Sequence, residues 1–118
     1  MALYENSPAV ARHPITHWAK VRGNSTVTLF ASGNVSSATD LGTGHYRINF
    51  STAMPDTNYC CMGNTLKGDT NNDGNQNLQI GGCNAADSIN TGSIECRSRV
   101  PSHNGSNDPA CFWVAFTR

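Results

Sequence analysis

The stretch that decides the fold is Ala31–Tyr59, ASGNVSSATDLGTGHYRINFSTAMPDTNY. Its residues 45–51 alternate strictly between apolar and polar side chains, and the apolar ones are Tyr46, Ile48 and Phe50. Such alternation is typical of a strand with one buried and one solvent-facing side. Turn-forming Gly, Asp and Pro residues flank this strand at 40–44 and 53–56. The stretch holds no cluster of side chains equipped for chemistry, so it predicts a scaffold.

Strand signals continue on both sides of this stretch. Strands are expected at 15–21, 26–31, 35–39, 45–51, 57–63, 78–83, 93–100 and 110–117. Turn signals separate them and no helix is expected. The sequence therefore predicts an all-β fold, an antiparallel β-sandwich or jelly-roll-like barrel of about eight short strands, in a single domain over 15–118. The last strand is apolar on both faces, as expected for a strand in the middle of a sheet or at an interface.

The first 14 residues lack strand periodicity, and Pro8 and Pro14 favour extended backbone there. We expect an N-terminal attachment arm over 1–14, because an ordered arm needs a surface on which to dock. The residues expected to bind a partner through this arm are Leu3, Tyr4, Pro8, Val10 and Arg12.

Charge and hydropathy argue against two classes of partner. Eight Lys and Arg balance eight Asp and Glu, so the formal net charge is +0 and nothing favours nucleic acid or an anionic membrane surface. No apolar run approaches the length of a membrane span, and no signal peptide is expected at the N-terminus.

Five cysteines, an odd number, occur in the chain. Without an export signal, free thiols are expected rather than a disulfide framework. No C-x-x-C pair is present, so the spacing of a zinc site is missing. We interpret the cysteines as small buried strand residues. They are Cys60, Cys61, Cys83, Cys96 and Cys111.

The polar segment around 69–80 matches the opening of a calcium loop, with candidate ligands Asp69, Asn71 and Asp73. A complete loop needs a carboxylate at its twelfth position, which is Ile80 here. A turn-rich polar loop is the preferred interpretation, with a partial cation site as the alternative. We expect no cofactor.

Nothing in the sequence has the pattern of an active site, and we expect a protein that is not an enzyme. No G-x-S-x-G elbow and no paired carboxylates are present. Asp40, Asp56, Asp73 and Asp108 lie in turns, where they are expected to cap backbone amides. The four histidines are dispersed, and His17 and His45 are expected on strand surfaces.

Seven aromatic residues are expected in the core: Trp18, Tyr46, Phe50, Tyr59, Phe112, Trp113 and Phe116. Trp113 is also the best candidate for an exposed, partner-binding aromatic, because its neighbours Phe112 and Val114 can supply the core face of the strand. Exposed aromatics on a sandwich can bind sugars or a protein partner.

Residues 18–59 resemble a β-rich module found at the C-terminal ends of bacteriophage tail fibres and related virion proteins. Three features carry the resemblance: NVSS at 34–37, DLGTG at 40–44, and the strand that runs into AMPD at 53–56. The module is structural, so the resemblance implies no catalytic residues.

The resemblance implies a virion surface protein that assembles in the host cytoplasm, where free thiols are expected. By analogy with fibre-type modules we expect a homotrimer. The first hypothesis is a fibre or knob protein, attached through its arm to tail, portal-region or capsid proteins, with loops 67–77 and 101–109 facing a host glycan or receptor. The expected receptor-facing residues are Asp69, Asn72, Asn75, His103, Asn104 and Asn107. The alternatives are a capsid cement protein and a glycan-binding accessory module.

Overall fold

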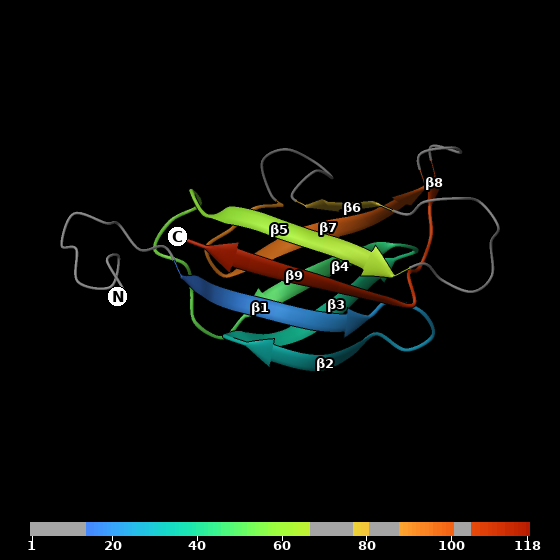
Figure 1. Ribbon diagram of the computed structural model, residues 1–118, viewed down its shortest axis with the longest axis horizontal. Helices are drawn as coiled ribbons and strands as arrows, with labels where there is room; N and C mark the ends of the chain where they lie inside the picture. Colours follow the sequence, from blue (N-terminus) through green and yellow to red (C-terminus); the bar gives the residue numbers. More distant parts are fainter. Residues whose placement is uncertain (1–13, 67–76, 81–87, 101–104) are drawn as a thin grey trace, which may run out of the picture.

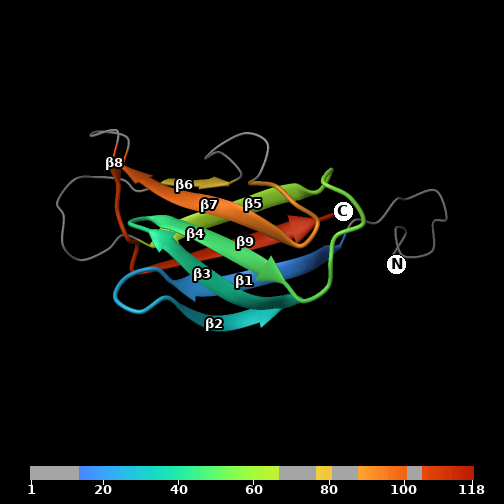
Figure 2. The same cartoon turned by 180° about the vertical axis from the view of Figure 1, so that it is seen from behind.

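The computed structural model is a sandwich of two antiparallel sheets, and it describes residues 14–66, 77–80, 88–100 and 105–118. Sheet A has the order β2-β1-β9-β5, which are Thr28–Gly33, Ile15–Arg22, Cys111–Thr117 and Cys60–Leu66. Sheet B has the order β3-β4-β7-β6, which are Val35–Gly42, His45–Phe50, Ser93–Val100 and Asn77–Ile80, with the short β8 (Gly105–Ser106) beside β7. Figure 1 shows sheet A in front and Figure 2 shows sheet B in front. The prediction of an all-β sandwich is confirmed.

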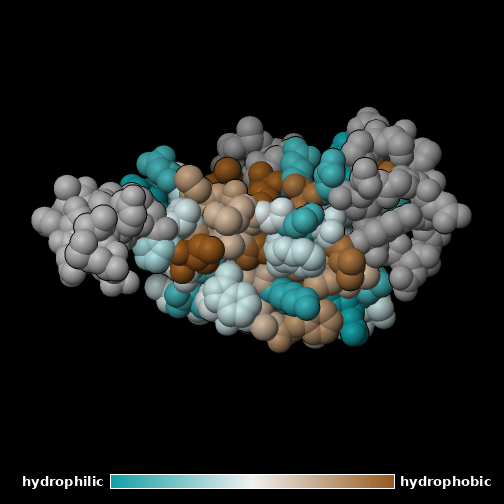
Figure 3. Space-filling model, in the orientation of Figure 1, coloured by the Kyte–Doolittle hydropathy of each residue, from teal (hydrophilic) through white to brown (hydrophobic). Residues whose placement is uncertain are grey.

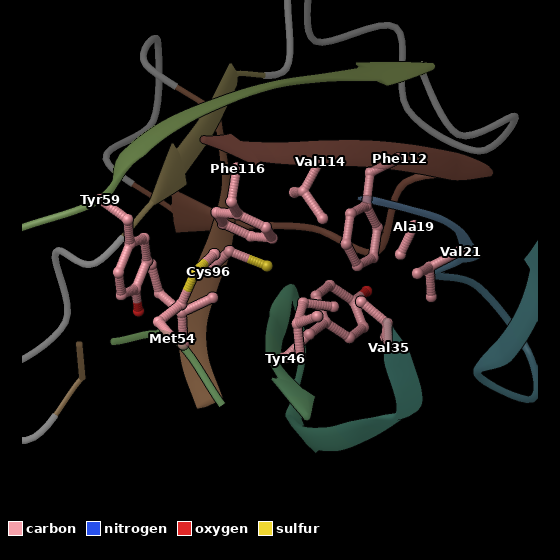
Figure 4. Packing of buried hydrophobic residues seen from close by; sticks show 12 residues of the cluster. Ala19, Val21, Val35, Tyr46, Met54, Tyr59, Cys96, Phe112, Val114 and Phe116 are labelled. Carbon is pink, nitrogen blue, oxygen red and sulfur yellow. The ribbon is translucent and has the colours of Figure 1, made fainter. Parts of the chain in front are cut away.

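The core lies between the sheets and is built from alternate residues of the central strands. Phe112, Val114 and Phe116 of β9 point toward Tyr46 and Cys96 of sheet B (Figure 4). The rings of Tyr46 and Phe112 lie 4.8 Å apart between centroids. Fully buried side chains of this kind are the main favourable term in folding. Among the described residues no helix is present that could span a membrane.

The chain passes from sheet A to sheet B at Asn34, between β2 and β3. Asn34 has a φ of 55°, in the left-handed region that asparagine tolerates better than most residues. Its side-chain amide donates to the carbonyl of Thr16 over 2.6 Å, which ties the crossing to β1. Part of the NVSS motif is therefore a corner of the sandwich.

Two expectations about β1 are wrong. Trp18 was expected in the core and is 42% exposed, whereas His17 was expected at the surface and is 4% exposed. The inward side of β1 is His17, Ala19 and Val21, so Trp18 must point outward. The buried His17 ring still has a hydrogen-bond partner, because its Nε2 donates to the carbonyl of Thr52 over 2.6 Å.

The cysteine prediction is right in part. Cys96 and Cys111 are buried, Cys61 is half-buried, and Cys60 is exposed at the start of edge strand β5. The four are free thiols. Cys83 lies outside the described residues.

Candidate functional site: the apolar face of sheet A

Among the residues that the structure describes, the large hydrophobic side chains that remain exposed all belong to strands of sheet A. They are Ile15, Trp18, Phe30, Met62, Leu66 and Trp113, between 41% and 55% exposed. We call the outward side of sheet A that carries the last five the apolar face. Figure 3 shows apolar and aromatic side chains over the middle of this face, with few hydrophilic ones between them. Single exposed hydrophobics are normal, but a contiguous group points to an interaction site.

Strand register brings these residues together in rows across the sheet. One row is Gly33, Trp18, Ala115 and Met62, and the next is Ala31, Lys20, Trp113 and Asn64. In the first row, Trp18 lies between Gly33 and Ala115, and Met62 lies beside Ala115, so both large side chains have a small neighbour. At Gly33 even a methyl group would come within 2.5 Å of Trp18 Nε1, so the indole lies directly over the glycine.

Ala115 leaves a hollow between the two indoles. Trp18, Trp113 and Met62 surround it, Lys20 and Asn64 flank it, and its volume is about 510 Å³. We call it the Ala115 hollow. A second depression of about 600 Å³ lies on the other side of Trp113, toward Phe30 and Leu66. Trp113 thus forms a ridge between two depressions, a position in which aromatic side chains often anchor a partner.

The charge of this face has one sign. The four strands of sheet A contain no Asp or Glu, and the outward cations are Lys20 and Arg22. The guanidinium of Arg22 lies 5.1 Å from the centre of the Phe30 ring, in cation–π contact. Lys20 has no carboxylate partner within the described part of the chain. The face is therefore apolar and cationic.

The outer side of sheet B is different, because its charges are paired with one another. Glu95 accepts from Arg47 over 2.9 Å, and its second oxygen lies 3.0 Å from His45 Nε2. The hydrogen bond from Arg47, followed by that from His45, holds the pKa of Glu95 below its usual value. Nδ1 of the same ring lies 3.4 Å from the Arg97 guanidinium. These contacts stabilise the pairing of β4 with β7 and leave a hydrophilic surface.

Three aspartates have the capping role that their turn positions predicted. Asp40 accepts from the amide of Gly42, and Asp56 accepts from that of Asn58. Asp108 accepts from the amide of Gly44 over 2.7 Å and from the buried Tyr46 hydroxyl over 2.9 Å. Asp73 lies outside the described residues. These carboxylates maintain turns and are not grouped for acid–base chemistry.

Only two of the predicted partner and receptor residues can be placed. Trp113 is exposed, as predicted, on the apolar face. Asn107 is half-buried, and its carbonyl packs against Gly44, where an added Cβ would lie 2.8 Å away. The others lie outside the described residues: Leu3, Tyr4, Pro8, Val10, Arg12, Asp69, Asn72, Asn75, His103 and Asn104. The candidate cation ligands Asp69, Asn71 and Asp73 lie outside them as well. In the described part, no three His, Cys, Asp or Glu side chains come close enough to hold a metal ion.

Sequence reasoning missed most of the apolar face, namely Trp18, Lys20, Phe30, Met62 and Leu66. A signal for part of it exists in WAKVR, residues 18–22, where apolar residues occupy both parities of one strand. The same two-sided pattern drew attention to the last strand. Both strands are the central pair of sheet A.

Comparison with protein-family models finds no match to the chain. No curated protein and no solved structure matches it either.

Proposed function

We propose that the protein is a non-enzymatic structural component of a bacteriophage virion exterior, of fibre or knob type, and that it assembles through the apolar face of sheet A. The observation that carries the assembly role is the contrast between the two outer surfaces. Exposed Trp, Phe, Met and Leu side chains gather on sheet A, while paired charges cover the central strands of sheet B. The virion setting is supported by the resemblance of residues 18–59 to tail-fibre modules.

The composition of the apolar face suits a protein partner. The centres of protein interfaces are enriched in Trp, Phe, Met and Arg and depleted of carboxylates. Trp113, Trp18, Met62, Phe30 and Arg22 match this composition, and the four strands contribute no acid. A solvent-exposed face of this kind promotes association, so another chain is expected to cover it.

We propose that this other chain is a second copy and that the assembly is a homotrimer. A closed ring of three copies uses a head-to-tail contact, in which one surface of each copy meets a different surface of the next. The apolar face is then one half of each contact. The outer side of sheet B and the loops remain for host-surface adhesion.

Sedimentation equilibrium tests the assembly role. The chain has a mass of 12.6 kDa, and the unaltered protein is expected at three times that value. Trp113→Lys places a charge at the centre of the apolar face and is expected to sediment as a monomer. Thr43→Lys, in the exposed turn between β3 and β4, is the matched control and should remain trimeric. A folded Trp113→Lys variant with the mass of the unaltered protein would contradict the proposal.

Imaging of particles tests the virion role. An antibody against the protein should label purified phage particles at the tail end if it is a fibre protein. Labelling over the head would favour the cement alternative, in which loss of the protein lowers particle stability to heat and low salt and leaves adsorption unchanged. No labelling of any particle would remove the virion role.

One observation favours glycan binding as a second candidate function. Two indoles beside a hollow, with Lys20 and Asn64 at its edge, offer stacking for a sugar ring and donors for its hydroxyl groups. A glycan array tests it: binding should be seen with the unaltered protein and lost with Trp18→Ser. Binding that persists in Trp18→Ser would rule out this site.

A further inference from the structure

Electrostatics restricts what can cover the apolar face. If two such faces met directly, Lys20 and Arg22 of each copy would approach those of the other. The eight strands involved would offer no carboxylate in return. Like charges brought together at an interface are unfavourable and disfavour that partner. The covering segment should therefore be apolar and should carry an acidic residue.

If the covering segment belongs to a second copy, its acidic residue can be found among the chain's own Asp and Glu residues by elimination. It has eight Asp and Glu, of which four are described: Asp40, Asp56, Glu95 and Asp108. Each of these four already accepts hydrogen bonds near its own position. The other four are Glu5, Asp69, Asp73 and Asp87. Glu5 alone among them directly follows a pair of large apolar residues, Leu3 and Tyr4.

The place where the described chain begins lies next to the apolar face. The hydroxyl of Thr117, at the end of β9, donates to the carbonyl of Pro14 over 2.9 Å. From Pro14, Trp18 at the edge of the Ala115 hollow lies four residues along β1, which is about 13 Å at 3.3 Å per residue. Tyr4 lies ten residues before Pro14, so up to about 33 Å of extended chain can separate them, which is a longer reach than the distance to Trp18 of the same chain.

We infer that residues 1–13 of one copy cover the Ala115 hollow of the neighbouring copy, with Leu3 and Tyr4 in the hollow and Glu5 beside Lys20. A neighbour is favoured over the same chain because Pro8 and Pro14 favour extended backbone, whereas docking on its own sheet would require the chain to reverse its direction just before Pro14. The inference rests on the proposed function, since it names the part of the second copy that completes the interface.

Full-length variants test this inference, because the core contacts given for the described residues are made without Leu3 and Tyr4. Sedimentation equilibrium should give a monomer for Leu3→Ser combined with Tyr4→Ser. The control Asn6→Ala, a polar residue of the same segment, should keep the mass of the unaltered protein. Tryptophan emission should shift to longer wavelength in the double variant alone.

A charge exchange tests the pairing of Glu5 with Lys20. Lys20→Glu should weaken trimer formation by about tenfold, because each trimer loses three such ion pairs. Adding Glu5→Lys to the same chain should restore most of that loss. No restoration by the second change would overturn the assignment of Glu5 to Lys20.

The failures of the two proposals can be told apart. A double variant that keeps the mass and emission of the unaltered trimer overturns the inference and leaves self-assembly through the apolar face in place. If the unaltered protein is monomeric and its tryptophans are shielded, the segment docks on its own chain. That result overturns exchange between copies. If the unaltered protein is a monomer with exposed tryptophans, both the proposed self-assembly and the inference are overturned.

Discussion

A single buried hydroxyl joins three parts of the chain at one end of the sandwich. The Tyr46 hydroxyl donates to the carbonyl of Gly23 over 2.8 Å or to Asp108 over 2.9 Å. Asp108 also accepts from the amide of Gly44. Burial and the neighbouring Asp108 raise the Tyr46 pKa far above its ordinary value, so the hydroxyl stays protonated as a donor. The turns around Gly23, Gly44 and Asp108 are held together in this way.

Tyr46→Phe should lower the free energy of unfolding by about 1–3 kcal/mol, because it removes the hydroxyl that donates to the carbonyl of the buried Gly23. Equilibrium unfolding in urea measures the change. Tyr59→Phe is the matched control, since it removes one hydrogen bond, to the carbonyl of Asn90. The control should cost less. A Tyr46→Phe protein as stable as the unaltered one would contradict this role.

Alkaline pH should destabilise the fold through Tyr59 and Cys61. Burial raises the pKa of Tyr59 from 10.0 to about 12 and that of Cys61 from 9.0 to about 11. Both groups lose protons more readily in the unfolded chain. Their contribution to stability is therefore complete below pH 9 and is lost progressively as the pH rises to about 12.

Urea unfolding at intervals from pH 8.5 to about 11.5 tests this linkage. The free energy of unfolding should fall steadily over the range, and Tyr59→Phe should make the decline above pH 10 less steep, while the contribution of Tyr46 remains. The opposite sign, a protein that gains stability as the pH rises, would refute the burial of these two groups.

At the scale of the element, sequence alternation predicted most strands and their facing. The inward residues of β4 and β7 follow the expected parity, and β7 has the expected bounds, Ser93–Val100. The strand expected at 57–63 instead begins at Cys60. Local composition does not reveal the delay, because Met54 bonds to Thr91 and Tyr59 bonds to Asn90, contacts from a distant part of the chain.

Gly63 of β5 shows how one element depends on a residue without a side chain. A Cβ at this position would come within 2.6 Å of Leu78 in β6 and 2.8 Å of the Trp113 carbonyl. Gly63→Ala should therefore destabilise the protein by about 1–3 kcal/mol, because backbone as well as side chains would have to move.

Thermal unfolding measures this effect. Gly92→Ala is the control, since an added Cβ at Gly92 meets nothing within 4 Å, and it should leave the melting temperature unchanged or raise it slightly. If Gly63→Ala melts at the same temperature as Gly92→Ala, the close approach of β6 to β5 is wrong.

At the scale of the whole molecule, the order of strands could not be predicted from local signals. The first and last strands, β1 and β9, lie side by side in the middle of sheet A. This pairing exposes Trp18 and Trp113 together on one side. Apolar residues on both faces predicted an exposed Trp113 in the last strand, whereas the same pattern in the first strand was missed. The sequence therefore suggested one exposed tryptophan, and the fold brings together two.

The chain has two tryptophans, and both lie on the apolar face. Tryptophan fluorescence therefore reports on that face alone, and its quenching by acrylamide across a dilution series tests the central claim most directly. If the face is an assembly interface, both indoles should be shielded at high protein concentration and become several-fold easier to quench as dilution separates the copies. Equal, easy quenching at every concentration would show a face that no other chain covers and would contradict the account.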